Sequence, residues 1–459
     1  MLKDIFREYD IRGIIDEELN KFNVKLIGYC LGIEMKKRGA KTCSIGRDAR
    51  LSGENLKKFL ISGLKAAKIE VFDIGLIPTP VGYYSVFSEM FDANIQITGS
   101  HNPPQYNGFK ITIFKDSFYG KELAKMGEQV LDLASKNFDI KDDENAKFVD
   151  ALTLYVNFIT DQFSYMKDWN FDFVVDNANS VASVSIKKIV EKLNLRAKIL
   201  FENPDGNFPN HHPDPSEEKN LKDLKNELIK QNLKIGFSFD GDADRIGVIV
   251  GQRRILGDEL ACLLSLNMKN PKILGDVKSS QILEIFVKNQ GGSVVIGRTG
   301  HSNIKKAIKE QNFDLGAEVS GHIYFKERFF GFDDAVYAMM RVLELVYKGF
   351  DLQKELEKFP KFFSTEEIKI KTDENLKFKA IENLKDFLQS NKILKIGEIL
   401  DINLVDGVRV KFQNGWALVR ASNTTATIVA RFEAQDEKFL SALQKFFLDK
   451  MDEILKNYK

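Results

Sequence analysis

The sequence TGSHNP at residues 98–103 directly follows the short apolar stretch 94–97, which is typical of a β-strand. Gly99 allows the backbone to turn tightly after that strand, and Pro103 stops a helix from continuing. Together they place the hydroxyl of Ser100 on the surface at a strand end, among backbone amides, as a phosphate-binding loop requires. The same residue types are common in ordinary turns, so this segment alone leaves both interpretations open.

A second segment, DGDADR at residues 240–245, follows the apolar run Ile235–Phe239 and places three carboxylates at alternate positions. These carboxylates belong to Asp240, Asp242 and Asp244. They would repel one another unless a cation neutralised them, so the pattern predicts a site for a hard divalent ion with oxygen ligands. An EF-hand loop is excluded because its sixth residue would be Arg245 instead of glycine, and the small number of carboxylates favours Mg²⁺ over Ca²⁺. A solvated acidic turn is the alternative interpretation.

A third segment, GAEVSGH at residues 316–322, carries an acid, a hydroxyl and an imidazole at alternate positions between glycines. In an extended chain, Glu318, Ser320 and His322 would point to the same side. A carboxylate beside a hydroxyl suits the vicinal hydroxyls of a sugar. An edge strand with a polar face would give the same spacing.

A fourth segment, RASNTT at residues 420–425, lies between the apolar runs 416–419 and 426–429. A guanidinium followed by hydroxyls and an amide is suited to an anion, because arginine can contact two phosphate oxygens at once. The residues expected to bind the anion are Arg420, Ser422, Asn423 and Thr424. Taken singly, the segment also fits an unremarkable polar turn.

Strand-like and helix-like stretches alternate along the chain, which predicts an α/β architecture. A strand, a helix and a second strand at residues 42–76 recur at 171–201 and at 272–297, so we expect three similar units of about a hundred residues each. Their polar loops lie past strand ends, where α/β sheets bind ligands. Strands dominate residues 366–432, and a long amphipathic helix begins near Glu437.

The expected fold is therefore three similar mixed α/β domains and a smaller C-terminal α+β domain around a central cleft. Pro360 marks a linker before the last domain. The expected domains are, in chain order, residues 1–145, 146–248, 249–360 and 361–459, and each carries one of the four segments.

Composition agrees with a multidomain protein of the cytoplasm. A chain of 459 residues is too long for one core, and its formal net charge of +1 gives no attraction to nucleic acid or to an anionic membrane. The cysteines at positions 30, 43 and 262 show no zinc or disulfide spacing. The start of the chain lacks the apolar core of a signal peptide, and no apolar run approaches membrane-spanning length.

Together the four segments, in this order and at these separations, resemble the α-D-phosphohexomutase family. They match its phosphoserine, metal-binding, sugar-binding and phosphate-binding loops. Further matches are FREYDIRG at residues 6–13, DVK at 276–278, RTGH at 298–301 and DGVR at 406–409. The resemblance covers essentially the whole chain.

Within that family, TGS at residues 98–100 and YNGFK at 106–110 look like the bacterial phosphomannomutase/phosphoglucomutase group. Two departures are visible: Val319 stands where that group commonly has methionine, and DNANS at 176–180 replaces a glycine-rich turn. They concern fine specificity and one loop, and no catalytic position.

The resemblance implies an enzyme that moves a phosphoryl group between C1 and C6 of a hexose, through phosphorylated Ser100 and a bisphosphorylated sugar. Mg²⁺ would be held by Ser100, Asp240, Asp242 and Asp244, and glucose 1,6-bisphosphate or mannose 1,6-bisphosphate would be the intermediate and activator. The implied catalytic residues are Ser100, Lys110, His301, Arg12 and His101. The implied substrate-binding residues are Tyr9, Arg245, Lys278, His301, Glu318, Ser320, His322, Arg420, Ser422, Asn423 and Thr424. His211 and His212 fall outside these motifs and are expected to lie in a polar loop.

Several alternatives stay open at this point. Phosphoglucosamine mutases share the fold and chemistry, a haloacid-dehalogenase-type phosphatase would carry its phosphoryl group on Asp240, and a non-catalytic relative would only bind sugar phosphates. The sequence also leaves open the preferred hexose, the general acid and base, and whether the protein is a monomer or a dimer.

Overall fold

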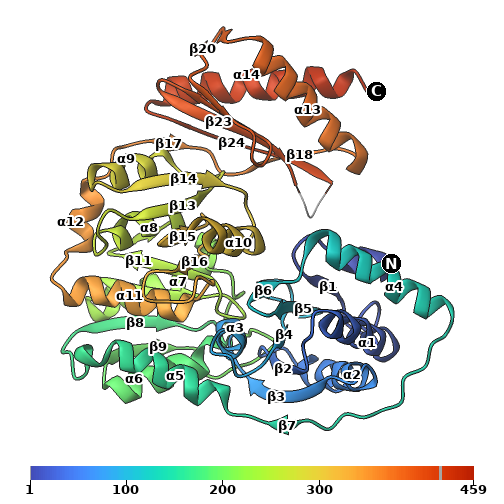
Figure 1. Cartoon of the computed structure of the whole chain (residues 1–459). Coiled ribbons are helices and arrows are strands. Elements are labelled where there is room, and N and C mark those ends of the chain that lie inside the picture. The colour runs from blue at the N-terminus through green and yellow to red at the C-terminus, as the bar shows by residue number, and fades with distance from the viewer. Residues whose placement is uncertain (1, 423–425, 459) are drawn as a thin grey trace.

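The computed structural model describes residues 2–422 and 426–458 and contains four main β-sheets in chain order (Figure 1). The first sheet has the strand order β1-β5-β4-β2-β3-β7, and β6 pairs with β5. Its strands are β1 (Ile11–Ile14), β2 (Thr42–Arg47), β3 (Glu70–Leu76), β4 (Ala93–Ile97), β5 (Tyr106–Ile113), β6 (Asp116–Ser117) and β7 (Lys147–Phe148). The helices of this part are η1 (Leu2–Ile5), α1 (Lys21–Lys37), α2 (Gly53–Ala66), α3 (Thr79–Phe87) and α4 (Gly120–Ser135).

The second and third sheets have the orders β12-β11-β10-β8-β9 and β14-β13-β15-β16. The strands of the second sheet are β8 (Asp172–Asp176), β9 (Arg196–Leu200), β10 (Ile235–Phe239), β11 (Ile246–Val250) and β12 (Arg253–Ile255). The helices of this unit are α5 (Ala151–Gln162), η2 (Ser164–Met166), α6 (Ala182–Leu193), η3 (Glu218–Leu221) and α7 (Lys222–Gln231). The strands of the third are β13 (Lys272–Asp276), β14 (Ser293–Gly297), β15 (Leu315–Ala317) and β16 (Ile323–Phe325), and its helices are α8 (Gly257–Ser265), α9 (Gln281–Asn289), α10 (His301–Gln311), α11 (Ala335–Tyr347) and α12 (Leu352–Glu357).

These three sheets share one topology, which confirms the expectation of three similar units. The common orders are β5-β4-β2-β3, β11-β10-β8-β9 and β16-β15-β13-β14, each with three parallel strands and one antiparallel strand beside them. In every unit the predicted functional loop connects the last parallel strand to the antiparallel one. These loops are β4–β5, which carries Ser100, β10–β11, which carries the three aspartates, and β15–β16, which carries Glu318.

Two short edge strands extend the first two sheets beyond the residues expected from the sequence. β7 pairs with β3, and β12 pairs with β11, so the first sheet reaches residue 148 and the second reaches residue 255. The domain limits expected at residues 145 and 248 stop before these strands, because neither strand has an apolar run that would reveal it.

The fourth sheet is antiparallel, with the order β17-β24-β23-β22-β21 and β18 paired with β24. Its strands are β17 (Phe363–Ser364), β18 (Ile368–Lys371), β21 (Asp401–Asn403), β22 (Val408–Phe412), β23 (Gly415–Ala421) and β24 (Thr427–Ala434), next to a small hairpin of β19 (Ile393–Leu394) and β20 (Gly397–Glu398). Its helices, α13 (Glu374–Ser390) and α14 (Glu437–Lys456), cover one face (Figure 1). α14 was expected, whereas the expectation that strands dominate residues 366–432 was wrong for α13. Its apolar residues, such as Ala380, Leu384 and Leu388, recur every four residues and pack on the sheet.

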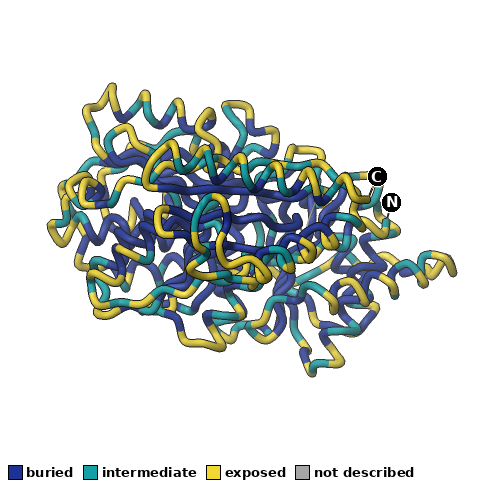
Figure 2. The backbone as a smooth tube through the Cα atoms, turned by 90° about the horizontal axis from the view of Figure 1, so that it is seen from above, coloured by how far each residue is buried: buried dark blue, intermediate teal, exposed yellow. Residues whose placement is uncertain are grey.

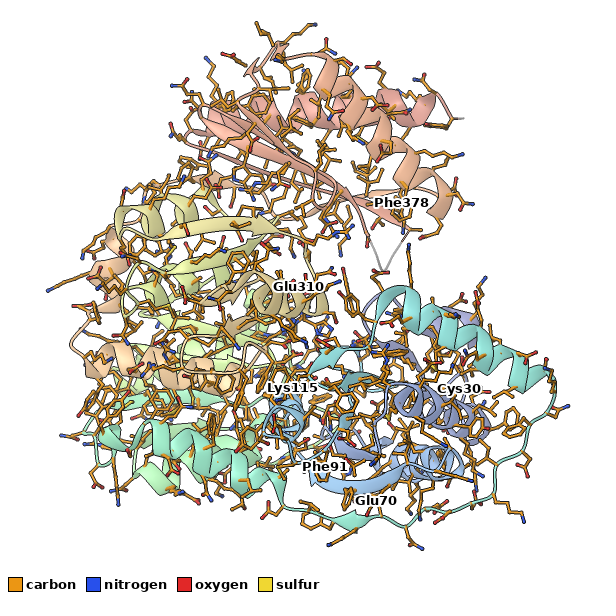
Figure 3. The ribbon with its side chains drawn as sticks, in the orientation of Figure 1. Cys30, Glu70, Phe91, Lys115, Glu310 and Phe378 are labelled. Carbon is orange, nitrogen blue, oxygen red and sulfur yellow. The ribbon has the colours of Figure 1, made fainter. Side chains whose placement is uncertain are left out.

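The buried residues run through the interior of all units, with exposed segments around the outside (Figure 2). The first sheet and the fourth sheet each have a hydrophobic core of their own. The second and third sheets share one large cluster, which also contains residues of β3, α3 and α11, and each of the two also has a smaller cluster of its own. Side chains from neighbouring units fill the space between their ribbons (Figure 3). Among the helices of residues 2–422 and 426–458, none combines the length and the apolar character needed to cross a bilayer.

Candidate active site

The serine loop and the aspartate loop meet directly. Ser100 Oγ donates a hydrogen bond to Asp240 Oδ2 at 2.9 Å, although the two residues are 140 positions apart in the chain. The backbone of Asp242 is held by α3, because the amide of Thr79 donates to its carbonyl at 2.9 Å. The two segments that the sequence relates only by resemblance therefore form one site.

Ser100 is buried, with only 3% of its surface exposed, so the expectation of a surface hydroxyl was wrong. The sequence places the tight turn at Gly99, but the left-handed backbone conformation is at Ser100 itself, with φ of 48°. Gly99 is required for another reason: a Cβ atom there would lie 2.4 Å from Cζ of Arg50. A non-glycine residue in this conformation costs about 1–3 kcal/mol, and it persists only where the surroundings enforce it.

The surroundings of the serine loop are supplied by the residues that follow β2. The guanidinium of Arg50 donates to the carbonyl oxygens of Ser100 at 2.9 Å and of Pro103 at 2.8 Å, and it pairs with Asp48 at 3.2 Å. Asp48 also accepts hydrogen bonds from Thr98 Oγ1 and from the amide of Gly99. Because the side chains of Asp48 and Arg50 are almost fully buried, this ion pair holds the serine loop in place from the interior of the protein.

The three aspartates form a compact, fully buried group. One carboxylate oxygen from each of Asp240, Asp242 and Asp244 lies within 4.8 Å of the other two. Burial raises the pKa of Asp240 well above its usual range, and the neighbouring Asp244 and Asp242 raise it further. Oδ1 of Asp242 and Oδ1 of Asp244 have no hydrogen-bond partner among the described residues. A buried cluster of carboxylates whose oxygens lack hydrogen bonds suits a divalent cation, so the group fits the metal site expected from the sequence.

Lys110 on β5 faces this group from the first sheet. Its ammonium contacts Oδ2 of Asp242 at 2.6 Å and also pairs with Asp244. Although burial favours the neutral amine, these carboxylates raise the pKa of Lys110 above its usual value. In this arrangement Lys110 is a fixed positive charge beside the serine loop.

The segment at residues 318–322, predicted to bind the sugar, is a turn, so the expectation of an extended segment with three side chains on one side was wrong. The amide of Gly321 donates to the carbonyl of Glu318 at 2.9 Å, and Gly321 has φ of 98°. Glu318 Oε1 accepts from the amide of Gly300 at 2.8 Å, and Oε2 accepts from the hydroxyl of Tyr324 at 2.7 Å. Ser320 lies half-buried at the tip of the same turn.

His322 connects this turn to the aspartate loop. Its Nε2 accepts from Nε of Arg245 at 2.9 Å, and its Nδ1 lies 3.1 Å from Asp333 Oδ2 and 3.6 Å from Asp244 Oδ1. The ring of His301 stacks beside His322 with centroids 6.1 Å apart. The second and third predicted loops therefore belong to the same site as Ser100.

His301, the first residue of α10, is held by a residue one turn along that helix. Lys305 Nζ lies 3.2 Å from Nδ1 of His301 and 3.2 Å from Oδ1 of Asp333. Burial lowers the pKa of His301 well below its usual value, and the charge of Lys305 lowers it further, so the imidazole is neutral near pH 7. Burial lowers the pKa of Lys305, and its ion pair with Asp333 opposes this effect. With Lys305 held as an ammonium by that ion pair, it can only donate, so Nδ1 of His301 accepts and the proton of the neutral ring is on Nε2.

Tyr9 and Arg12, from the amino-terminal signature, reach the same area from the first sheet. The hydroxyl of Tyr9 donates to the carbonyl of Thr299 at 3.1 Å, and its ring lies 6.0 Å from that of His301. Arg12 donates to the carbonyl of Gly99 at 3.0 Å and pairs with Asp10. His101 Nδ1 lies 3.1 Å from Ser100 Oγ.

The fourth loop is linked to this site through Asp406. The guanidinium of Arg420 pairs with Asp406 at 3.0 Å, and the same carboxylate accepts from the amide of Thr299 at 3.2 Å. Ser422 is held by Lys377 of α13, which donates to its carbonyl at 2.7 Å. Lys278 pairs with Glu367 at 3.0 Å. Arg420, Ser422 and Lys278 thus make these contacts within the third and fourth units, and Asn423 and Thr424 lie outside the described residues.

Several residues that hold the site were missed from the sequence: Asp48, Arg50, Thr79, Lys305, Asp333 and His212. The ring of His212, expected in a polar loop, contacts the carbonyl of His101 in the serine loop. Two of the six had a sequence signal, because the acid–base pair Asp48 and Arg50 directly follows a strand. β2 lies beside β4 in the sheet, so the ends of the two strands share an edge.

Comparison with known proteins gives matches along the whole chain. The family descriptions "Phosphoglucomutase/phosphomannomutase, alpha/beta/alpha domain I", domain II and domain III match residues 3–130, 153–253 and 256–362, and the C-terminal domain of the same family matches residues 367–450. The phosphomannomutase/phosphoglucomutase of Pseudomonas aeruginosa is 39% identical over 455 residues, which cover 97% of this chain and 95% of that protein. The phosphoglucomutase of Neisseria gonorrhoeae is 35% identical over 456 residues, covering 97% and 96%.

Solved structures agree with these matches. A crystal structure of a phosphoglucomutase/phosphomannomutase family protein from Burkholderia thailandensis has a TM-score of 0.88 and 33% identity, and the match covers 98% of each chain. The N-acetylphosphoglucosamine mutase of Aspergillus fumigatus has a TM-score of 0.62 at 16% identity, over 98% of this chain and 96% of that one, and shares the fold. The resemblance noted in the sequence is confirmed, and the chain belongs to the phosphoglucomutase/phosphomannomutase family.

Proposed function

We propose that this protein is a phosphohexomutase that interconverts the 1-phosphate and the 6-phosphate of a hexose, mannose or glucose or both. The observation that carries the proposal is the meeting of Ser100 and Asp240, at 2.9 Å, beside a cationic Lys110. The named relatives, phosphomannomutases and phosphoglucomutases, support the same reaction.

Ser100 is proposed as the residue that carries the phosphoryl group between turnovers. The bond from phosphorus to Oγ breaks while a bond forms from phosphorus to the free hydroxyl oxygen of the sugar phosphate. That hydroxyl loses its proton, and Oγ gains one when it is released. The bisphosphorylated sugar then rotates in the site, so that its C1 and C6 ends exchange positions, and transfers its other phosphoryl group to Ser100. A transfer of this kind depends on positioning and charge neutralisation, which the buried loop, Arg12 and Lys110 can provide.

Mg²⁺ is the metal that we propose for the aspartate group. Asp240, Asp242 and Asp244 would hold it, with an oxygen on Ser100 as a further ligand, and the bound ion would neutralise charge on the transferring phosphoryl group. The unpaired Oδ1 atoms of Asp242 and Asp244 support this assignment. Arg245, whose pKa is raised by Asp240 and Asp244 although burial opposes it, adds a permanent cation next to the group.

The sugar is proposed to bind at the turn of the third unit, and its distal phosphate at the fourth loop. Glu318 and Ser320 would hold the hydroxyls O3 and O4, which lie near the axis about which the intermediate turns. Tyr9, Lys278 and His322 would complete this part of the site. Arg420, Ser422, Asn423 and Thr424 would hold the phosphate in either orientation, because a guanidinium can donate hydrogen bonds to any two oxygens of the phosphate.

This placement predicts activity on both mannose 1-phosphate and glucose 1-phosphate. The two sugars differ only at C2, and Glu318 is expected to contact other hydroxyls. Glu318→Gln, which keeps the size of the side chain and removes its charge, should lower kcat/KM for both substrates by a similar factor of about 10 to 10². A preference of the wild type for one sugar beyond about 10⁴-fold would reveal a dedicated contact at C2 and contradict this prediction.

His301 is proposed to donate a hydrogen bond to the substrate through Nε2, because Lys305 occupies Nδ1. Lys305→Met removes the contact at Nδ1, so the proton of the His301 ring is no longer fixed on Nε2. We expect the ¹⁵N signals of the ring to shift and kcat to fall by about 10²-fold. Lys309→Met, one turn further along α10 at an exposed ion pair with Asp116, is the matched control and should change neither. Unchanged ring signals in Lys305→Met would remove this role.

The phosphatase alternative makes a different covalent intermediate. Mass spectrometry of peptides from the purified protein should find the phosphoryl group on Ser100, whereas the haloacid-dehalogenase mechanism would place it on Asp240. Phosphoglucosamine mutase activity is tested in the same assays with glucosamine 1-phosphate. Activity on glucosamine 1-phosphate alone would support the phosphoserine mechanism but would identify glucosamine, instead of mannose or glucose, as the sugar.

A further inference from the structure

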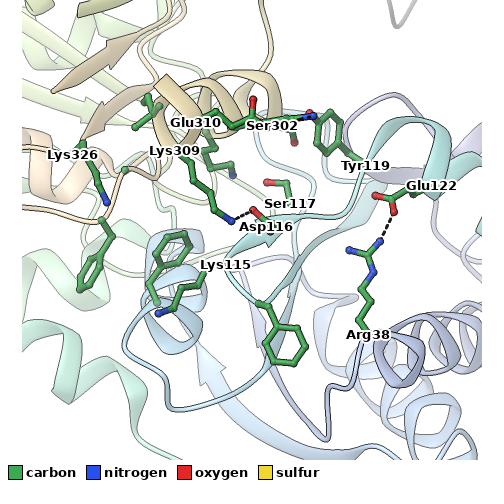
Figure 4. A pocket seen from close by; sticks show the side chains of 17 residues that line it. Arg38, Lys115, Asp116, Ser117, Tyr119, Glu122, Ser302, Lys309, Glu310 and Lys326 are labelled. Atoms are coloured by element: carbon green, nitrogen blue, oxygen red, sulfur yellow. Dashed lines mark hydrogen bonds and ion pairs between the residues drawn. The ribbon is translucent and has the colours of Figure 1, made fainter. Parts of the chain in front are cut away.

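A cavity lies between the first and third units, and of the residues discussed so far only Lys305 and Lys309 of α10, with Asp116, line it. Its volume is about 580 Å³, and its walls come from the β5–β6 hairpin, the ends of α1 and α4, and helix α10 (Figure 4). Lys115 of the hairpin and Glu310 of α10 belong to its two sides and lie near the middle of the molecule (Figure 3). None of the residues of the four predicted loops lines it, so the inference below does not depend on the proposed function.

The cavity has an excess of positive charge. Three acidic side chains line it, against six cationic ones, namely Arg38, Lys115, Lys305, Lys306, Lys309 and Lys326. Some of these charges are paired, as in the ion pairs of Arg38 with Glu122 and of Lys309 with Asp116. Lys326 has no ion pair among the described residues, and Lys306 lies 3.9 Å from its closest carboxylate, Glu310. Two lysines are therefore available for an anion.

The hairpin at the rim is held in an unfavourable conformation. Phe114 and Lys115 form the two-residue turn between the paired residues Ile113 and Asp116, and both have positive φ, 48° and 70°. Turns of this kind strongly favour Asn-Gly, because larger residues are strained there. The ring of Phe114 is 43% exposed and lines the cavity, and backbone strain of this kind is concentrated at functional positions.

Aromatic rings accompany the lysines. Phe87, Phe114, Tyr119 and Phe330 line the same cavity as Lys115 and Lys326 (Figure 4). Flat rings stack on the faces of nucleobases, while lysines bind phosphate as point charges. The volume lies within the range of small-molecule sites. We propose that this cavity binds a nucleoside phosphate, with the base against Phe114 and the phosphates at Lys306 and Lys326.

Isothermal titration of the full-length protein with ADP, GDP and UDP tests the proposal. We expect at least one of them to bind, and the double variant Lys306→Glu/Lys326→Glu to weaken binding at least tenfold. Lys269→Glu/Lys445→Glu, which reverses two exposed charges elsewhere, should bind as the wild type does. Both variants should keep the mutase activity of the wild type, which shows that they fold.

Two further measurements identify the site and the ligand. Phe114→Asn/Lys115→Gly relaxes the turn, so it should raise the melting temperature and still weaken nucleotide binding. Inorganic pyrophosphate should bind at least tenfold more weakly than the nucleotide. The proposal is overturned if none of the nucleotides binds, if the charge-reversed variant binds equally well, if pyrophosphate binds as tightly, or if glucose 1,6-bisphosphate displaces the nucleotide.

Discussion

Ser100→Ala is expected to lower kcat by about 10³-fold or more, because the variant has no atom on which to carry the phosphoryl group. The fold should survive. The substitution removes one hydrogen bond, from Oγ to Asp240, which is worth about 1–3 kcal/mol when the acceptor is charged. Activity in both directions, a melting curve and the mass of the phosphopeptide are the measurements.

Two controls separate the chemistry from the burial of a serine. Ser265→Ala removes an equally buried hydroxyl in α8 and should leave the rate unchanged. Wild-type protein that has been dephosphorylated should regain activity when glucose 1,6-bisphosphate is added, and Ser100→Ala should not. Full activity in Ser100→Ala would exclude this residue from the reaction.

Removal of divalent metal should abolish turnover, and added Mg²⁺ should restore it. The physical reason is that three buried carboxylates would otherwise oppose an incoming dianion. Asp242→Asn, which removes one charge from the group, should weaken the affinity for Mg²⁺ by about 10²-fold or more. The measurements are activity in excess chelator and a Mg²⁺ titration of the rate.

Glu344→Gln is the matched control for the loss of a buried carboxylate. Glu344 lies in α11, is 1% exposed and pairs with Arg328 and Arg341. This variant should lose stability but titrate with Mg²⁺ as the wild type does. Turnover that persists in excess chelator would show that the aspartates serve another purpose.

The sequence alone predicts much of the fold because its signals are local. Strand–helix–strand patterns fix the three units, and the apolar run of β10 is fully buried, as expected for a strand between two others. α13 was missed because charged residues separate the apolar residues that mark its buried face. Its helical structure is stabilised by packing of these apolar residues on the fourth sheet. The strands β7 and β12 were missed because two or three residues carry no periodicity.

The site was predictable only as separate segments. Motifs indicated Ser100, the three aspartates and Glu318, but not the conformation of the turn at residues 318–322, which is set by hydrogen bonds to Gly300 and Tyr324. The supporting residues were hidden because each acts on residues that are distant in the sequence or lie in another unit. Lys305, for example, touches Asp333 and His301, and nothing in its local sequence distinguishes it from the exposed lysines around it.

The large cluster shared by the second and third sheets determines how this protein loses its structure. Because Phe237 of β10 and Phe325 of β16 belong to one hydrophobic cluster, we expect the second and third units to unfold together. The aspartate loop and the Glu318 turn are therefore lost together. The fourth sheet has a core of its own, but Trp416 and Leu418 of β23 also pack with Val277 of the third unit, so its unfolding would expose that cluster and remove Arg420 from the candidate site.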